Sequence, residues 1–253
     1  MPILCTSLHA QESAATEASL AAPTQSQNLA IEPSAVQKSF EELPTQEQET
    51  FIGHLKQASS LISRDRLLEA FNEIEKAEEI FKEYPSIYNL KGAAWVRLKE
   101  VDKARQAFKK ALALNPKAFD VQFNLAELLF VERKFPQALS AFQNILTQFP
   151  QLHSDQYHLV QYKTQICHLQ LGQMAEADKI EQSFTYTDDT PAYYYTRIAK
   201  AYATDDTSEA SDWLRSAANI FQPNENQIYL DALVEMGWIS ALDKPTVDIE
   251  ETP

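Results

Sequence analysis

The chain repeats a short pattern of alanines with a period of 34 residues. Ala70, Ala104 and Ala138 stand 34 positions apart, and each is followed four positions later by a large apolar residue. These followers are Ile74, Phe108 and Phe142. A period of this length is typical of proteins in which each unit is one pair of helices that stacks on the next pair. The shared period therefore predicts a shared structural unit.

The composition favours helices over sheets. Only 4 Gly occur among 253 residues, whereas β-sheet proteins usually need many more glycines at turns, bulges and hairpins. The hydrophobic fraction of 44% with 23% charged residues is that of a soluble globular protein, and not of a disordered or membrane-spanning one. We therefore expect a folded, all-α protein without an integral membrane span.

Two consecutive units resemble the tetratricopeptide repeat. The first unit reads Tyr88-x2-Lys91-Gly92-x2-Trp95, then Ala104-x3-Phe108-x2-Ala111 and Pro116. The second unit reads Leu125-Ala126-x2-Leu129, then Ala138-x3-Phe142 and Pro150. Departures from the family pattern occur at Lys91, Gln122 and Ile145. In this pattern the small residues allow two antiparallel helices to approach closely, while the large residues pack beside the crossing.

Weaker copies of the pattern flank these two units, so the resemblance covers about residues 45–222. It implies an all-α, right-handed α-solenoid of about five tetratricopeptide-like hairpins, of which the fourth spans roughly Asp155 to Phe184. An amphipathic stretch from Gln227 to Leu242 should form a capping helix over the last hairpin, because an uncapped terminal repeat would expose its apolar face.

The remaining segments divide the chain into four parts. Residues 1–10 end on Leu8-His9-Ala10, which resembles the end of a truncated signal peptide, although an ordinary disordered N-terminus is an equal alternative. Residues 11–44 have the composition of a disordered linker, residues 45–242 form the repeat domain, and residues 243–253 form a disordered acidic tail.

The sequence carries no recognisable catalytic, metal or cofactor motif. No histidine pair has the spacing of a metal-dependent hydrolase, and the glycines are isolated from one another. The two cysteines, Cys5 and Cys167, cannot form a disulfide framework, and Cys167 is interpreted as a core residue. The net charge of −14 disfavours nucleic acid as a partner. We therefore expect a non-enzymatic protein with neither metal nor cofactor.

The resemblance places a binding groove on the first helix of each hairpin. The groove residues that it implies are Asn89, Ala93, Val96, Arg97, Asp120, Phe123, Glu127, Phe130, Val131, Tyr162 and Ile166. The family's better-known carboxylate-clamping groove uses basic and amide side chains, whereas this chain has Ala93, Phe123 and Glu127 at those places. A groove that is partly apolar and partly acidic suits an amphipathic helix or extended peptide with hydrophobic anchors and some positive charge.

The sequence therefore predicts a scaffold or adaptor that binds a protein or peptide in this groove. Within one helix, Leu125 and Leu129 are assigned to the hairpin core, and Phe123 and Phe130 are expected to be exposed in the groove. The signal-like start suggests a periplasmic or secreted protein. The alternative is a cytoplasmic secretion-type chaperone that holds apolar export substrates. The partner, the pathway and the oligomeric state are left open.

Overall fold

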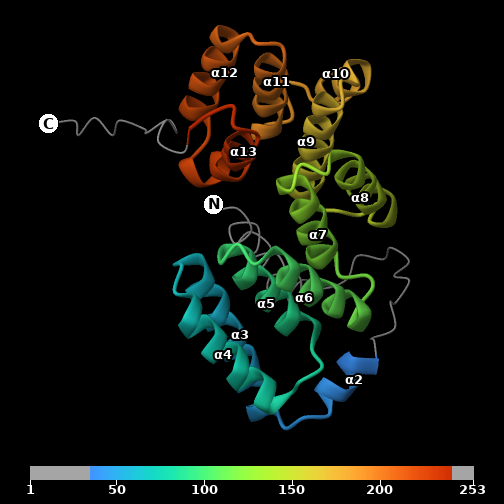
Figure 1. Cartoon of the computed structure of the whole chain (residues 1–253), viewed down its shortest axis with the longest axis vertical. Helices are drawn as coiled ribbons and strands as arrows, with labels where there is room; N and C mark the ends of the chain where they lie inside the picture. The colour runs from blue at the N-terminus through green and yellow to red at the C-terminus, as the bar shows by residue number, and fades with distance from the viewer. Residues whose placement is uncertain (1–34, 241–253) are drawn as a thin grey trace, which may run out of the picture. The chain divides into compact units, whose positions relative to one another are not determined.

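The computed structural model describes residues 35–240 and consists, over that range, of helices and their connections (Figure 1). The predictions for residues 1–10 and 243–253, and for most of the linker, lie outside the described residues. The helices are α2 (Ala35–Glu41), α3 (Thr45–Ser63), α4 (Leu67–Ile80), α5 (Pro85–Arg97), α6 (Val101–Leu114), α7 (Phe119–Val131), α8 (Phe135–Gln148), α9 (Ser154–Gln170), α10 (Met174–Ser183), α11 (Pro191–Ala203), α12 (Thr207–Ile220) and α13 (Pro223–Met236).

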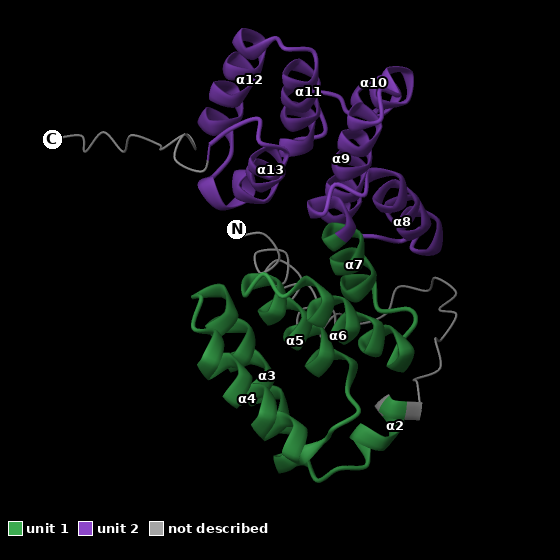
Figure 2. Cartoon of the chain, in the orientation of Figure 1, with its two compact units in different colours: residues 1–128 green, residues 129–253 purple. Residues whose placement is uncertain are grey.

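The chain forms two compact units, residues 1–128 and 129–253 (Figure 2). In unit 1, helices α3 and α4 form one antiparallel pair, and α5 and α6 form the next. In unit 2, helices α9 and α10 pair in the same way, as do α11 and α12. The boundary falls inside α7, whose last turn belongs to unit 2 together with α8.

The turn between the two helices of each pair has one residue in the left-handed conformation. These residues are Asp65, Lys99, Arg133, Gly172 and Asp205, with φ between 58° and 70°. In the second pair, the backbone N–H of Lys99 donates to the carbonyl of Val96 and that of Glu100 donates to Trp95, both at 2.9 Å. The same two bonds recur at the other turns, and they satisfy carbonyls that the end of a helix leaves without partners.

The small residues of the repeat lie at the helix crossings, as predicted. Ala70, Ala104 and Ala138 have no exposed surface. A Cβ added to Gly92 would lie 2.8 Å from Cζ of Phe108 on the facing helix, a distance that real Cβ atoms essentially never show. The close approach of α5 and α6 therefore depends on a residue without a side chain.

Helix α2 corrects the predicted extent of the linker. Residues 35–41 are helical although they were assigned to a linker spanning 11–44. Phe40 is buried, and its ring centroid lies 5.0 Å from that of Phe51 and 4.9 Å from that of Tyr84. This short helix was missed because Pro33 and Pro44 bracket it too closely for any apolar periodicity to be visible.

Helix α13 differs from the predicted capping helix at both ends. It was expected over Gln227–Leu242 but begins at Pro223 and ends before Gly237, whose φ is 74°. Pro223 occupies the first helical position, and a capping box links Gln222 to Glu225. Pro at the first position and Gly just past the last residue are ordinary helix boundaries, and these two signals outweigh the apolar pattern that suggested the later start.

No helix among the described residues is long and apolar enough to cross a lipid bilayer.

Candidate protein-binding surface

All eleven residues predicted for the groove lie on the first helices of the hairpins, namely α5, α7 and α9. Three of them are half-buried, and these are Arg97, Asp120 and Val131. The other eight are buried, and these are Asn89, Ala93, Val96, Phe123, Glu127, Phe130, Tyr162 and Ile166.

Phe123 and Phe130 were expected to be exposed, and this expectation is wrong. Their side chains are 3% and 0% exposed, respectively. Phe123 packs against Phe119 within unit 1, whereas the Phe130 ring lies 6.0 Å from the ring of Phe135 and contacts α8 within unit 2. Leu125, which was assigned to the core, is half-buried.

The error has a physical cause. Helix α7 is apolar on nearly all sides, with hydrophobic side chains at nine of its thirteen positions. A helix that is apolar on nearly all sides is usually enclosed by protein. Its sequence pattern therefore does not show whether Phe123 and Phe130 face a groove or the core.

A chain of side-chain hydrogen bonds joins α5 to α7 in unit 1. Asn124 Nδ2 donates to Asn89 Oδ1 at 2.8 Å, and Asn89 Nδ2 donates to Asp120 Oδ2 at 2.7 Å. Asn89 and Asn124 are 1% and 2% exposed. Buried amides that are satisfied by one another fix the register of the helices that carry them. Asn124 was not predicted, although its distance of 35 residues from Asn89 is close to one repeat period.

Asp120 also lines a pocket in unit 1. The pocket has a volume of about 140 Å³, enough for the end of one side chain. Its lining residues are Val36, Tyr84, Pro85, Ser86, Asn115, Ala118, Asp120 and Val121. Burial raises the pKa of the Asp120 carboxyl above its usual range. A carboxylate in such a place gains from a cationic group that restores the solvation it has lost.

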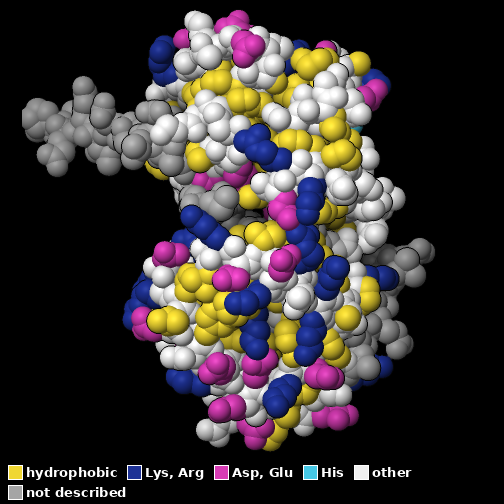
Figure 3. Space-filling view, viewed as in Figure 1, with side chains coloured by type: hydrophobic (Ala, Val, Ile, Leu, Met, Phe, Trp, Pro, Cys, Tyr) yellow, Lys and Arg dark blue, Asp and Glu magenta, His cyan; other side chains and the backbone are white. Residues whose placement is uncertain are grey.

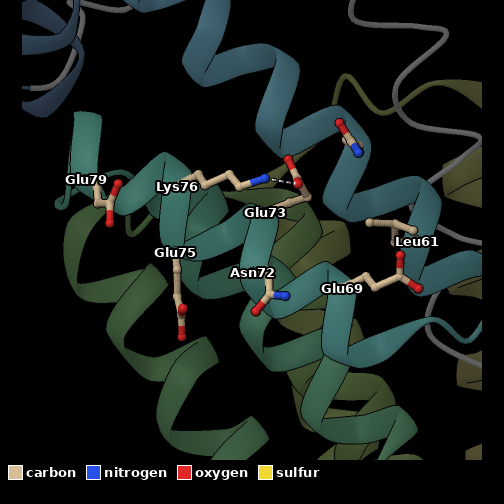
Figure 4. Close-up of a pocket in the computed structure, with 8 residues that line it drawn as sticks. Leu61, Glu69, Asn72, Glu73, Glu75, Lys76 and Glu79 are labelled. Atoms are coloured by element: carbon tan, nitrogen blue, oxygen red, sulfur yellow. Dashed lines mark hydrogen bonds and ion pairs between the residues drawn. The ribbon is translucent and has the colours of Figure 1, made fainter.

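A second and larger pocket in unit 1 lies between α3 and α4 (Figure 4). Its volume is about 370 Å³, and it is lined by Gln57, Leu61, Glu69, Asn72, Glu73, Glu75, Lys76 and Glu79. Glu73 accepts from Lys76 Nζ at 2.6 Å and lies 2.7 Å from His54 Nδ1. These bonds hold Glu73 in place, while the surrounding carboxylates make the pocket acidic.

Arg97 pairs with a residue of the preceding hairpin. Its guanidinium lies 3.1 Å from Asp65 in the preceding hairpin turn, and the Arg97 side chain is 12% exposed. The ion pair ties α5 to the turn between α3 and α4, so this predicted groove residue contributes to the packing of adjacent hairpins.

The predicted groove residues of α9 lie inside unit 2. Tyr162 and Ile166 have no exposed surface. The Tyr162 hydroxyl donates to the backbone carbonyl of Tyr229 on α13 at 3.2 Å. Cys167, interpreted as a core residue, is fully buried. Over the described part of the chain, no group of three or more His, Cys, Asp or Glu side chains could hold a metal ion.

Comparison with known proteins identifies the repeat. Residues 55–118 and 96–163 each match a family described as tetratricopeptide repeat. The solved structure of PilF from Pseudomonas aeruginosa is 14% identical over 77% of this chain and 90% of its own, with a TM-score of 0.57. PilW, described as a widely conserved type IV pilus biogenesis factor, is 14% identical over 77% of this chain and 88% of its own, with a TM-score of 0.55. No curated protein matches in sequence.

These likenesses establish the fold, and they agree with the helical pairs, the buried alanines and the repeated turns described above. The predicted fold class, an all-α solenoid of tetratricopeptide-like hairpins, is confirmed. Residues 55–163 match the tetratricopeptide repeat family, and the described helices have the fold of tetratricopeptide repeat proteins.

Proposed function

We propose that the protein is a non-catalytic scaffold that binds a peptide or helix of another protein along α5 and α7 of unit 1. The tetratricopeptide fold is a protein-interaction fold. The observation that carries the proposed position is Asp120, which lines a pocket while its neighbours Asn89 and Asn124 are held in a buried chain of hydrogen bonds.

The chemistry of unit 1 favours a partner with hydrophobic anchors and some positive charge. Asp120 lines the smaller pocket, and four glutamates line the larger one. Figure 3 shows apolar side chains interspersed with both basic and acidic ones on the face of unit 1 that it displays. Electrostatic complementarity of this kind selects the partner and speeds its association, while apolar anchors supply most of the affinity.

The proposal is tested by panning a library of displayed peptides against the full chain. The enriched peptides are then measured by fluorescence anisotropy with the wild type and with Asp120→Asn. This substitution preserves the shape of the side chain and an oxygen that can accept from Asn89, but removes the charge. We expect enriched sequences to contain Lys or Arg beside apolar residues, and Asp120→Asn to weaken binding about tenfold, as for the loss of a charge-assisted hydrogen bond.

Asp102→Asn is the matched control. Asp102 is exposed in the first turn of α6 and does not line either pocket. It should bind the peptides as the wild type does. Equal affinity of wild type and Asp120→Asn, or a failure of the library to yield any enriched sequence, contradicts the proposed site.

We further propose that the scaffold is exported, acting in the periplasm or outside the cell. Leu8-His9-Ala10, which resembles the end of a signal peptide, supports this location. The likeness to PilF and PilW concerns the fold alone. A cytoplasmic chaperone for apolar export substrates is the alternative. Fractionation of native cells, with N-terminal sequencing of the mature protein, separates the two: a cytoplasmic, uncleaved chain contradicts export.

A further inference from the structure

Helix α13 contacts parts of unit 2 that a cap of the last hairpin would not reach. A cap covers the two helices before it, here α11 and α12, and Figure 1 shows α13 beside both. However, α13 also contacts α9, because the Tyr229 and Tyr162 rings have centroids 5.2 Å apart. Its C-terminal carbonyls accept from Arg133 in the turn between α7 and α8, at 3.3 Å from Met236 O. The helix therefore contacts two first helices of the repeats, α9 and α11, and the turn that follows a third. The family's ligands are expected to lie on first helices in the same way.

The contacts of α13 enclose it on more than one side. Leu230, Asp231 and Ala232 are consecutive and all buried. Consecutive residues of a helix point about 100° apart, so three buried in a row leave less than half of the circumference to solvent at this level. A terminal cap has one exposed face throughout. The enclosure is that of a helix lying in a groove.

The surface of α9 and α11 that α13 contacts combines an aromatic cluster with a buried ion pair. The Tyr229 ring stacks on that of Tyr195 from α11 at 5.2 Å and tilts against that of Tyr162. Lys163 Nζ lies 3.2 Å from Glu235 Oε2, and the two side chains are 2% and 1% exposed. The same ammonium lies 4.5 Å from the centre of the Phe130 ring.

This composition is more typical of recognition than of a stabilising core. A buried ion pair costs desolvation energy, and replacing one with apolar side chains is often neutral or stabilising. Ligand sites, in contrast, are mostly apolar surfaces with a few placed polar groups that fix orientation. Lys163 fixes the position of one carboxylate along the helix, and Arg133 lies at the helix's C-terminal end, where a cation is favourable.

We propose that the face of unit 2 formed by α9 and α11 is a helix-binding site that α13 occupies as an internal ligand. The partner that it fits is an amphipathic helix with an aromatic residue, a leucine four positions later and a carboxylate six positions after the aromatic, as Tyr229, Leu233 and Glu235 are arranged in α13. Such a helix takes the place of α13 and pairs its carboxylate with Lys163. This site is separate from the Asp120 pocket of unit 1.

The internal ligand has a large advantage over any partner. A segment tethered by a short connection acts at an effective concentration on the order of millimolar, and only Phe221 and Gln222 separate α12 from α13. A partner in free solution therefore competes well only when the docked helix is weakened. The experiment therefore compares the wild type with a variant whose docked helix is weakened.

The probe is a fluorescent peptide of residues 221–240, added to the full chain and followed by anisotropy. Tyr229→Ala in the chain weakens the tethered helix but leaves α9 and α11 unchanged. We expect this variant to bind the peptide at least tenfold more tightly than the wild type. Adding Lys163→Met to the variant should weaken that binding at least tenfold, and a peptide with Glu235→Gln should show the same loss. The Asp120→Asn substitution should have no effect on this peptide.

Two results overturn the proposal. One is the absence of binding to a Tyr229→Ala chain whose circular dichroism remains helical. The other is binding that Lys163→Met leaves unchanged. If Tyr229→Ala does not fold, hydrogen exchange of the wild type decides the matter. Amides of α13 should then exchange at least tenfold faster than those of α11, whereas equal rates for the two helices contradict an internal ligand that can be displaced.

Discussion

Gly92 provides a stringent test of the packing inside a hairpin. Gly→Ala in the interior of a helix ordinarily stabilises a protein by about 1 kcal/mol, because alanine is the better helix former. At Gly92 the added Cβ would lie 2.5 Å from Cδ1 and 2.8 Å from Cζ of Phe108. The Phe108 ring is fully buried, so it cannot swing into solvent to make room. Overpacking of a close-packed core costs about 1–3 kcal/mol. We therefore expect a net loss of about 1–2 kcal/mol for Gly92→Ala.

The matched control is Gly53→Ala, since Gly53 is also inside a helix but has no heavy atom within 4 Å of the added Cβ. This variant should gain about 0.5–1 kcal/mol from helix propensity alone. Urea titration followed by circular dichroism measures both free energies of unfolding. If Gly92→Ala proved as stable as the wild type or more so, α5 and α6 would not approach as closely as described.

Three further predictions concern stability. Ala104→Leu should lower the free energy of unfolding by about 1–3 kcal/mol in urea titration, since Ala104 is fully buried at a crossing; no loss would contradict the repeat register. Gly172→Ala should cost about 1 kcal/mol by the same assay, because φ is 70° there and a Cβ meets no neighbour; an unchanged midpoint would contradict that backbone. Burial raises the pKa values of Tyr162, Tyr195 and Tyr229 above the ordinary 10.0. The folded state therefore holds protons that the unfolded state loses, and stability should fall as the pH rises above about 10. The absorbance of these tyrosines at 295 nm should change only with unfolding, and their titration before unfolding would contradict their burial.

The repeat architecture could be predicted because it depends on local rules. A crossing between two helices requires a small residue, and the period of 34 residues shows where the crossings recur. The position of Ala104 is therefore as evident in the sequence as in the structure, where it is fully buried.

The candidate site was harder to predict because it depends on which face each helix presents. Helix α7 is apolar nearly all round, so its sequence did not reveal that Phe123 and Phe130 are buried. Asn124 on α7 donates to Asn89 on α5. The only signal of this bond in the sequence is that the two residues are 35 positions apart, which is close to the repeat period of 34. The docking of α13 on α9 joins Lys163 to Glu235, 72 residues apart, and no local pattern encodes a contact of that range.

The partner is proposed to bind along α5 and α7 of unit 1. The most direct test is to titrate a peptide enriched by the full chain into isotopically labelled protein and follow the amide and side-chain NH₂ signals. We expect the largest chemical-shift changes at Asn89, Asp120 and Asn124. Changes confined to the second helices α4 and α6, with these three residues unaffected, would contradict it.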